Sequence, residues 1–511
     1  MAKSRPNILL ITSDQQHWNT IGKHFEEVKT PNLDRLADQG MLARRAYCPN
    51  PTCTPTRSSI ITGQYASRHG AWVLGTKLPE TTPVVGDLLQ SEGYDCSLIG
   101  KAHFQPLLSD DRCPSIEAYP KLRELEFWRD FNGPYYGFNH IELARNHGDE
   151  CHVGQHYALW MEEKGFSNWR DHFQSNWGTI KFEDEKKNTP QTGAWSLPQE
   201  YHTNSWITER SIQRMRNAKD EERPFFLWSS YFDPHPPYLV PEPWASMYNP
   251  SELTVPEVSP GEHDHSPQPT RKTQELNPDF DEFIEEGISD HGFHSHLHDR
   301  KELAADIAIY YGMISFLDHH VGLLLDELDR LGLADNTMVI FTSDHGHYFG
   351  HHGLIAKGPF HYEDGIRVPF VARWPGRIPG AWESNSLISL VDLAPTILSA
   401  TGIAIPSNMQ GLDQLPVWED NHQGIRKGAI VEYRPQPTTM YLKTYINDRY
   451  KITVYLDRDD GELYDLTNDP GEVKNLWHDP GSLALRECLL REMLFEEMRS
   501  EPKPFPRIAP A

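Results

Sequence analysis

Apolar runs closed by polar residues recur along this chain and predict buried strands over residues 7–12, 224–230 and 337–342. Residues 94–99 form a further predicted strand, which Asp95 and Ser97 interrupt. Runs of this kind are typical of parallel strands that are covered on both faces of a sheet. Between them, apolar positions recur at helical spacing, most extensively over 302–331. Alternating strands and helices predict an α/β fold, with a mixed, mostly parallel sheet sandwiched by helices.

The pattern changes character in the C-terminal part of the chain. Residues 439–454 alternate between apolar and polar in the manner of strands, and a short apolar segment follows at 462–466. Residues 483–498 then return to helical spacing. We therefore expect two domains, a main domain over 1–420 and a smaller α+β domain with an antiparallel sheet and a helix over 421–511.

Two long segments of the main domain show neither period. Residues 105–201 are rich in Trp, His and Pro, and we interpret them as an insertion that covers the functional site. Their tryptophans favour an aromatic pocket or a dimer interface equally: Trp128, Trp160, Trp169 and Trp177. Residues 255–300 are acidic and His-rich, and this composition favours a solvated loop over a metal-binding segment.

Composition narrows the range of partners. The 511 residues include 48 basic and 73 acidic side chains, a net charge of −25, and no basic run stands out. An acidic surface argues against nucleic acid or an anionic membrane as the partner. No apolar stretch has the length of a transmembrane helix or of a signal-peptide core, so we expect a cytoplasmic protein. Six cysteines in a chain of this length do not form a dense disulfide framework.

Chemistry-bearing residues follow the ends of the predicted strands. Asp14 and Gln15 follow the first run, Lys101 and His103 follow the second, and the pair Asp344-His345 follows the last. Carboxyl ends of parallel strands meet at one edge of a sheet, which is where open α/β sheets bind ligands. Oxygen ligands with one imidazole suit a hard or borderline divalent cation such as Ca²⁺, Mg²⁺ or Mn²⁺.

A short stretch around a cysteine carries the most specific signal. Cys53-Thr54-Pro55-Thr56-Arg57 is followed by Thr62-Gly63. If residues 57–62 open a helix, the cysteine lies near a helix N-terminus, where an oxyanion is favoured.

This stretch resembles the maturation signature of the type I sulfatases, a formylglycine-dependent family of the alkaline phosphatase superfamily. Further segments are similar to the same family in the same order: residues 93–103, 226–235, 344–346, 357–358 with 367–369, and 462–466. The resemblance implies an alkaline-phosphatase-like fold. It also implies that Cys53 is oxidised by a formylglycine-generating enzyme to an aldehyde, whose hydrate attacks the substrate.

The resemblance also implies a metal site. Carried over position by position, the ligands of one divalent cation are Asp14, Gln15, Asp344, His345 and the formylglycine made from Cys53. Gln15 and His345 depart from the usual sulfatase residues and resemble the phosphonate monoester hydrolase branch instead. An imidazole ligand favours Mn²⁺, so both Mn²⁺ and Ca²⁺ stay open.

The basic residues receive catalytic roles from the same resemblance. Arg57 would hold the formylglycine, while Lys101 and Lys357 would neutralise charge on the non-bridging oxygens. His235 or Lys357 would protonate the departing alcohol or phenol, and His103 is the candidate base for expelling sulfate. Four further histidines receive no role: His347, His351, His352 and His361.

These residues together predict a sulfuric ester hydrolase of the arylsulfatase type. The alternative is a phosphonate monoester or phosphodiester hydrolase that uses the same site, as Gln15 and His345 suggest. A third hypothesis is a non-catalytic metal-binding scaffold in which Cys53 stays a thiol. The acidic chain with its Pro-rich C-terminal tail is compatible with a homo-oligomer, an expectation that rests on analogy.

Overall fold

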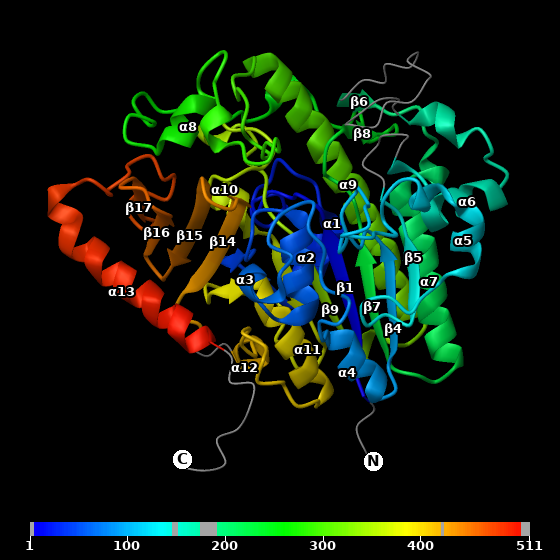
Figure 1. Cartoon of the computed structure of the whole chain (residues 1–511). Helices are drawn as coiled ribbons and strands as arrows, with labels where there is room; N and C mark the ends of the chain where they lie inside the picture. The colour runs from blue at the N-terminus through cyan, green and yellow to red at the C-terminus, as the bar shows by residue number, and fades with distance from the viewer. Residues whose placement is uncertain (1–4, 146–151, 174–191, 421–423, 502–511) are drawn as a thin grey trace, which may run out of the picture.

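An eight-stranded sheet forms the centre of the molecule (Figure 1). The computed structural model describes residues 5–145, 152–173, 192–420 and 424–501. In spatial order the strands are β12 (Trp382–Ser384), β2 (Met41–Ala43), β11 (Phe370–Arg373), β9 (Thr337–Ser343), β1 (Asn7–Ser13), β7 (Phe225–Ser230), β4 (Asp95–Gly100) and β5 (His140–Leu143). The five strands from β9 to β5 are parallel, and β11 runs antiparallel to both of its neighbours. The predicted mixed, mostly parallel sheet is confirmed.

Strand β1 shows why the sheet must be covered on both faces. Ile8 and Leu10 belong to one hydrophobic core, Leu9 and Ile11 belong to the other, and all four are fully buried. Successive side chains of a strand point to opposite faces, so a strand buried on both sides is apolar at every position.

None of the helices in the described part of the chain is both long and apolar enough to cross a membrane.

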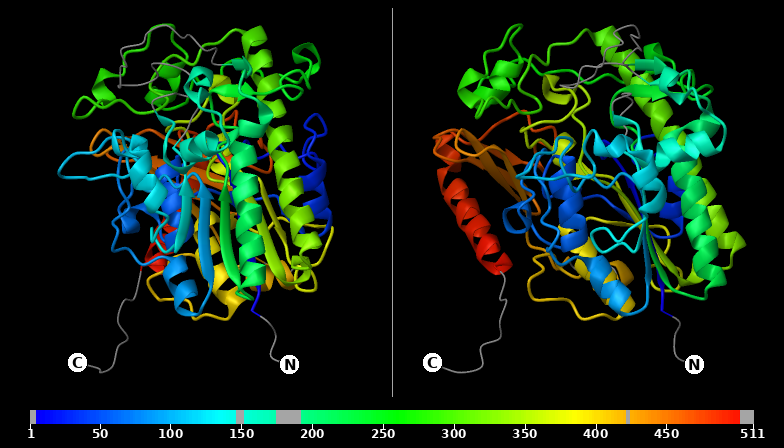
Figure 2. Two further views of the ribbon diagram at one scale, coloured as in Figure 1. Left: turned by 90° about the vertical axis from the view of Figure 1, so that its right-hand side faces the viewer. Right: turned by 45° about the vertical axis from the view of Figure 1, so that its right-hand side comes forward.

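Helices form a layer on each face of the sheet (Figure 2). The core around Ile8 is closed by α2 (Cys53–Thr62), α4 (Val85–Ser91) and α11 (Leu393–Thr401). The core around Leu9 is closed by α1 (Pro31–Asp38), α7 (Thr203–Asp220) and α9 (Arg300–Arg330). The sandwich of helices expected from the sequence is therefore present.

A separate antiparallel sheet lies at one end of the molecule (Figure 1). Its strands are β14 (Ala429–Gln436), β15 (Met440–Ile446), β16 (Tyr450–Tyr455) and β17 (Gly461–Asp465). Helix α13 (Leu483–Ser500) packs on it through a core that includes Ile430, Ile452, Leu463 and Leu489. The smaller α+β unit is thus observed, while its expected boundary near residue 421 lies outside the described residues and stays a prediction.

Segment 105–201 holds more regular structure than its sequence suggests. Strand β5 extends the central sheet beside β4, helix α6 (Gln155–Glu163) packs against β5, and helix α5 (Leu125–Asp130) packs against α6. Trp128, Trp160 and Trp169 are buried in the cores, which excludes them from an open aromatic pocket. Trp177 lies outside the described residues.

The His-rich segment 255–300 departs from the expected solvated loop. Phe280, Phe283 and Phe293 form a cluster with Tyr433 of the C-terminal sheet. His296 is fully buried, and its Nδ1 accepts a hydrogen bond from a backbone amide at 3.0 Å. These three phenylalanines anchor the segment to the C-terminal sheet, although the segment as a whole is acidic.

Candidate active site

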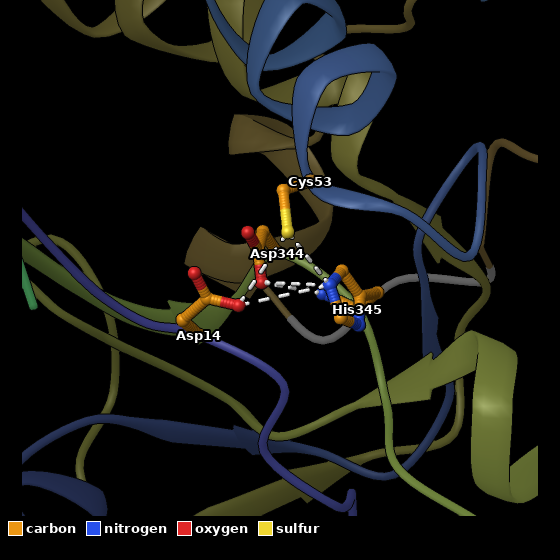
Figure 3. Close-up of side chains that lie close together, drawn as sticks. All are labelled: Asp14, Cys53, Asp344 and His345. Carbon is orange, nitrogen blue, oxygen red and sulfur yellow. Dashed lines mark hydrogen bonds and ion pairs between the residues drawn. The ribbon is translucent and has the colours of Figure 1, made fainter. Parts of the chain in front are cut away.

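Several segments of the chain converge at the carboxyl edge of the central sheet (Figure 3). Asp14 follows β1, Lys101 follows β4 and Asp344 follows β9, because these parallel strands all end at the same edge. Cys53 is the first residue of α2, so the helix begins earlier than the sequence pattern indicated at residue 57. The helix start therefore places the cysteine beside the three strand ends.

The side chain of Cys53 is buried among charged groups. Its Sγ lies 3.2 Å from Nε2 of His345 and 3.7 Å from Oδ1 of Asp14. Two ammonium groups are equally near, Nζ of Lys357 at 3.3 Å and Nζ of Lys101 at 3.6 Å. Burial and Asp14 raise the pKa of the Cys53 thiol, but the two lysines outweigh them and bring it below its ordinary value. Position 53 is therefore a place where negative charge is stabilised.

The same residues fit a divalent cation. Asp14, Cys53, Asp344 and His345 each offer a ligand atom, and these atoms lie within 4.8 Å of one another. Nδ1 of His345 donates to the carbonyl of Gly346 at 3.0 Å, so Nε2 carries the lone pair that a metal needs. Two carboxylates and one imidazole suit Mn²⁺ and also admit Ca²⁺.

Gln15 is a further buried polar side chain at this edge of the sheet. Its side chain is fully buried, and neither amide atom has a hydrogen-bond partner among the described residues. A buried amide without partners is costly, unless a bound ion accepts its oxygen as a ligand. Its backbone is fixed in place, because the amide of Gln15 donates to Oδ1 of Asp344 at 3.1 Å. Four of the five predicted metal ligands are thus brought together, and the backbone of the fifth, Gln15, is bonded to one of them.

Arg57 connects several parts of the site through hydrogen bonds. Its Nε donates to Oδ2 of Asp344 at 2.8 Å, and Nη1 donates to the carbonyl of Lys101 at 2.9 Å and to Oγ of Ser230 at 2.7 Å. One guanidinium group therefore ties α2 to the ends of β9, β4 and β7. The expected contact with residue 53 is indirect in this geometry, since Arg57 orients the carboxylate and strand ends around it.

His235 and Lys357 form a hydrogen-bonded pair beside Cys53. Nδ1 of His235 donates to the carbonyl of Pro236 at 2.6 Å, so its Nε2 accepts from Nζ of Lys357 at 3.1 Å. Burial and Lys357 hold the pKa of His235 well below its ordinary value. Burial lowers the pKa of Lys357, but Cys53 and Asp14 outweigh it and raise that pKa above its ordinary value. The proton of this pair therefore resides on the lysine.

The loop that carries His103 is held in place by Glu117, a residue that the sequence analysis did not single out. The carboxylate of Glu117 accepts from the backbone amides of His103 at 2.9 Å and Phe104 at 3.0 Å. The same carboxylate accepts from Nη1 of Arg145 and from the hydroxyl of Tyr135, both at 2.7 Å. Burial and Arg145 keep the pKa of His103 well below its ordinary value. Glu117 lies in the irregular segment 105–201, where no local signal marks it.

The histidines without an assigned role lie around the same edge. His347 is buried, and its Nε2 lies 2.6 Å from the hydroxyl of Tyr238. His361 is buried, and its Nδ1 lies 2.7 Å from Oγ1 of Thr444. The other two, His351 and His352, lie beside Asp364.

Comparisons with known proteins find similarity to sulfatases and to a phosphonate monoester hydrolase. The family model described as "Sulfatase" matches residues 6–403, and one described as "N-sulphoglucosamine sulphohydrolase, C-terminal" matches residues 350–500. An arylsulfatase of Clostridium perfringens is 28% identical over 426 residues, which cover 82% of this chain and 79% of that protein. The multifunctional alkaline phosphatase superfamily protein PehA of Trinickia caryophylli is 28% identical over 426 residues, covering 81% and 77%. The crystal structure of a phosphonate monoester hydrolase of Agrobacterium radiobacter superposes with a TM-score of 0.78 at 25% identity, covering 97% and 96%.

Replacing Arg57 with Lys should weaken the binding of a divalent cation by about 10- to 100-fold. A lysine keeps the charge but cannot hold Asp344 and two strand ends with one planar group. Metal retained after dialysis, measured by mass spectrometry of the elements, reports this change. The matched control is Arg68→Lys, because Arg68 lies exposed on α3 (Ala66–His69) and should leave metal content unchanged. Equal metal content in the wild type and the Arg57→Lys variant would contradict the bracing role.

Proposed function

The chain belongs to the sulfatase family, and we propose that it hydrolyses sulfuric esters with a formylglycine made from Cys53 and one divalent cation. The set of charged groups around residue 53 is the observation that supports this proposal most directly. Two carboxylates, one imidazole and two ammonium groups converge on a single buried side chain at the start of α2. Burying this many charged groups costs free energy, and a cysteine that served only in packing does not require them.

Asp14, Gln15, Asp344 and His345 are the residues that would hold the cation beside position 53. When present, the hydrated aldehyde supplies the nucleophile and the cation supplies positive charge for the non-bridging oxygens of the ester. Mn²⁺ is the cation that we propose, because the site contains an imidazole and an amide besides its carboxylates. Ca²⁺ is the alternative.

Lys101 and Lys357 provide the fixed positive charge of the site. Both ammonium groups lie within 3.6 Å of Sγ of Cys53, which marks where the nucleophile stands. Lys101 is also ion-paired with Asp14, which holds its chain in one orientation. Buried, preorganised cations of this kind stabilise the charge that develops on a sulfuryl group in the transition state.

The pair His235 and Lys357 supports one order of proton transfer. Lys357 carries the proton and lies closest to the reacting position, so we propose it as the donor to the departing alcohol. His235 orients that ammonium group through its neutral Nε2. His103 is likewise held neutral, and we propose it as the base that takes a proton when sulfate leaves. The proposed partner in maturation is a formylglycine-generating enzyme, and a homo-oligomer remains our expectation.

Cys53→Ala should abolish hydrolysis of an aryl sulfate, because the variant has no atom from which the nucleophile can be made. Mass spectrometry of the peptide spanning residues 52–57 should find the aldehyde in protein made in a host that contains the maturation enzyme. The matched control is Cys113→Ala, which changes a partly exposed cysteine and should retain activity. Activity that survives in Cys53→Ala would overturn the proposal, and a fully unmodified thiol would favour the metal-binding scaffold.

The second candidate function is hydrolysis of phosphonate monoesters or phosphodiesters. Gln15 and His345 in the ligand set favour it, as does the similarity to a phosphonate monoester hydrolase over nearly the whole chain. We expect kcat/KM for an aryl sulfate to exceed that for an aryl phosphonate monoester with the same leaving group. A ratio in the other direction would assign the chain to the second function. Detection of both activities is not decisive, so the ratio is the measurement.

Lys357→Met should slow the hydrolysis of alkyl sulfates by about 10²- to 10⁴-fold, since a poor leaving group needs a proton as it departs. Aryl sulfates with acidic phenols should lose much less, so the dependence of kcat/KM on leaving-group pKa becomes steeper. His235→Gln is the control, because a glutamine oxygen can still accept from Lys357. A steeper dependence in His235→Gln alone would identify the histidine as the donor instead.

A further inference from the structure

A second group of metal-ligating side chains lies close to the first but shares no residue with it. His17, His351 and Asp364 each offer one ligand atom, and these atoms lie within 4.8 Å of one another. His17 and Asp364 are buried, whereas the side chain of His351 is 39% exposed. His351 and Asp364 line a cavity of about 620 Å³. The cluster is therefore reachable from solvent without passing position 53.

Both imidazoles direct a nitrogen at the same carboxylate. Nδ1 of His17 accepts from the amide of Asn19 at 3.3 Å, so Nε2 donates to Oδ1 of Asp364 at 2.8 Å, and a metal ion would take the place of that proton. Nδ1 of His351 lies 4.0 Å from Oδ2 of Asp364. The two rings stack, with centroids 5.3 Å apart and planes 9° from parallel. An ion coordinated at about 2.1 Å by each ligand requires ligand atoms no more than about 4.2 Å apart. His351, whose side chain is half-exposed, is the ligand that would have to move closer to meet that limit.

The charge of the cavity favours a cation. Seven carboxylates and three arginines line it. Arg44 is paired with Glu383, and Arg367 stacks over the ring of Trp18 at 3.7 Å from the centroid. Oε1 of Glu363 is buried and has no hydrogen-bond partner among the described residues. An unpartnered buried carboxylate oxygen in an acidic cavity is stabilised when a positive ion enters.

The neighbouring His352 also contacts the carboxylate of Asp364. Its Nε2 lies 3.4 Å from Oδ2 of Asp364, while its Nδ1 lies 2.5 Å from Oε1 of Glu262. Burial lowers the pKa of His352, but Asp364 and Glu262 outweigh it and raise it to about 9. An ion bound by Asp364 therefore replaces one of the two contacts of this imidazolium, and Glu262 remains as its partner.

We propose that His17, His351 and Asp364 bind a second divalent cation, and that this ion has a structural role. Two imidazoles and one carboxylate with open positions are typical ligands of Zn²⁺. The site joins two loops, since His17 follows Asp14 and Gln15 after β1, and His351 follows Asp344 and His345 after β9. An ion here fastens together the two loops that carry the ligands of the first site.

Backbone contacts support the link between the two sites. The hydroxyl of Tyr310 donates to the carbonyl of Gln15 at 2.8 Å and accepts from the amide of His17 at 2.9 Å. The carbonyl of Asp364 accepts from the amide of His347 at 2.8 Å. These hydrogen bonds join the loop after β1 to Tyr310 and the loop after β9 to the backbone of Asp364. The proposal does not depend on the reaction that the first site catalyses.

The test is the number of ions bound per chain. The full-length protein is equilibrated with Zn²⁺, passed through a desalting column, and its metal content is measured together with its concentration. We expect two equivalents for the wild type, and one for each of Asp364→Asn and Asp344→Asn, because each variant loses a different site. His478→Ala removes an exposed histidine of the C-terminal unit and should retain two equivalents.

Two results would overturn the proposal. One is a single equivalent in the wild type that Asp344→Asn removes. The other is two equivalents retained in Asp364→Asn, which would place the second ion elsewhere. If Asp364→Asn fails to fold, His351→Ala replaces it, since the loss of this half-exposed ring leaves the contacts of Asp364 with His17 and His352 intact. One equivalent in His351→Ala supports the site, and two equivalents contradict it.

Discussion

Two carboxylates without any contact with solvent set the main constraint on this structure. Asp14 and Asp344 are fully buried, and a buried charge without a partner costs several kcal/mol. Lys101 pairs with the first and Arg57 with the second. Burial raises the pKa of Asp14, yet the basic groups around it, Lys101 first among them, carry it well below its ordinary value. The chain can satisfy both carboxylates only when α2 docks against the ends of the parallel strands.

The sequence was most informative where one local pattern decided the structure. Strands β1, β7 and β9 were predictable because their apolar runs are nearly continuous, whereas β4 was predictable although Asp95 and Ser97 interrupt its run. The polar residues that follow β1, β4 and β9 place Asp14, Lys101 and Asp344 at one edge. Helix α7 was missed because much of its buried face is polar, including Asn204 and Ser211. Strand β5 is short and only half-buried at alternate positions, so it gives no continuous run. The importance of Glu117 depends on tertiary contacts alone.

Two backbone carbonyls determine where the protons lie around residue 53. The carbonyl of Gly346 fixes the tautomer of His345, and the carbonyl of Pro236 fixes that of His235. In the neutral ring each imidazole turns its Nε2 toward the site, one facing Cys53 and the other facing Lys357. Burial and Lys357 keep the pKa of His235 well below its ordinary value, so this ring accepts from Lys357. Burial lowers the pKa of His345, but Asp344 and Cys53 outweigh it and raise that pKa above its ordinary value.

Helix α2 is buried along its whole length, from Cys53 to Thr62. No enzyme can reach the Cβ of residue 53 once this helix has docked against the sheet. The oxidation proposed for Cys53 therefore has to take place on a nascent or unfolded chain, and it competes in time with the collapse of the core. A chain that folds before this oxidation keeps its thiol. The proportion of chains with an aldehyde at position 53 therefore depends on the rate of oxidation relative to the rate of folding.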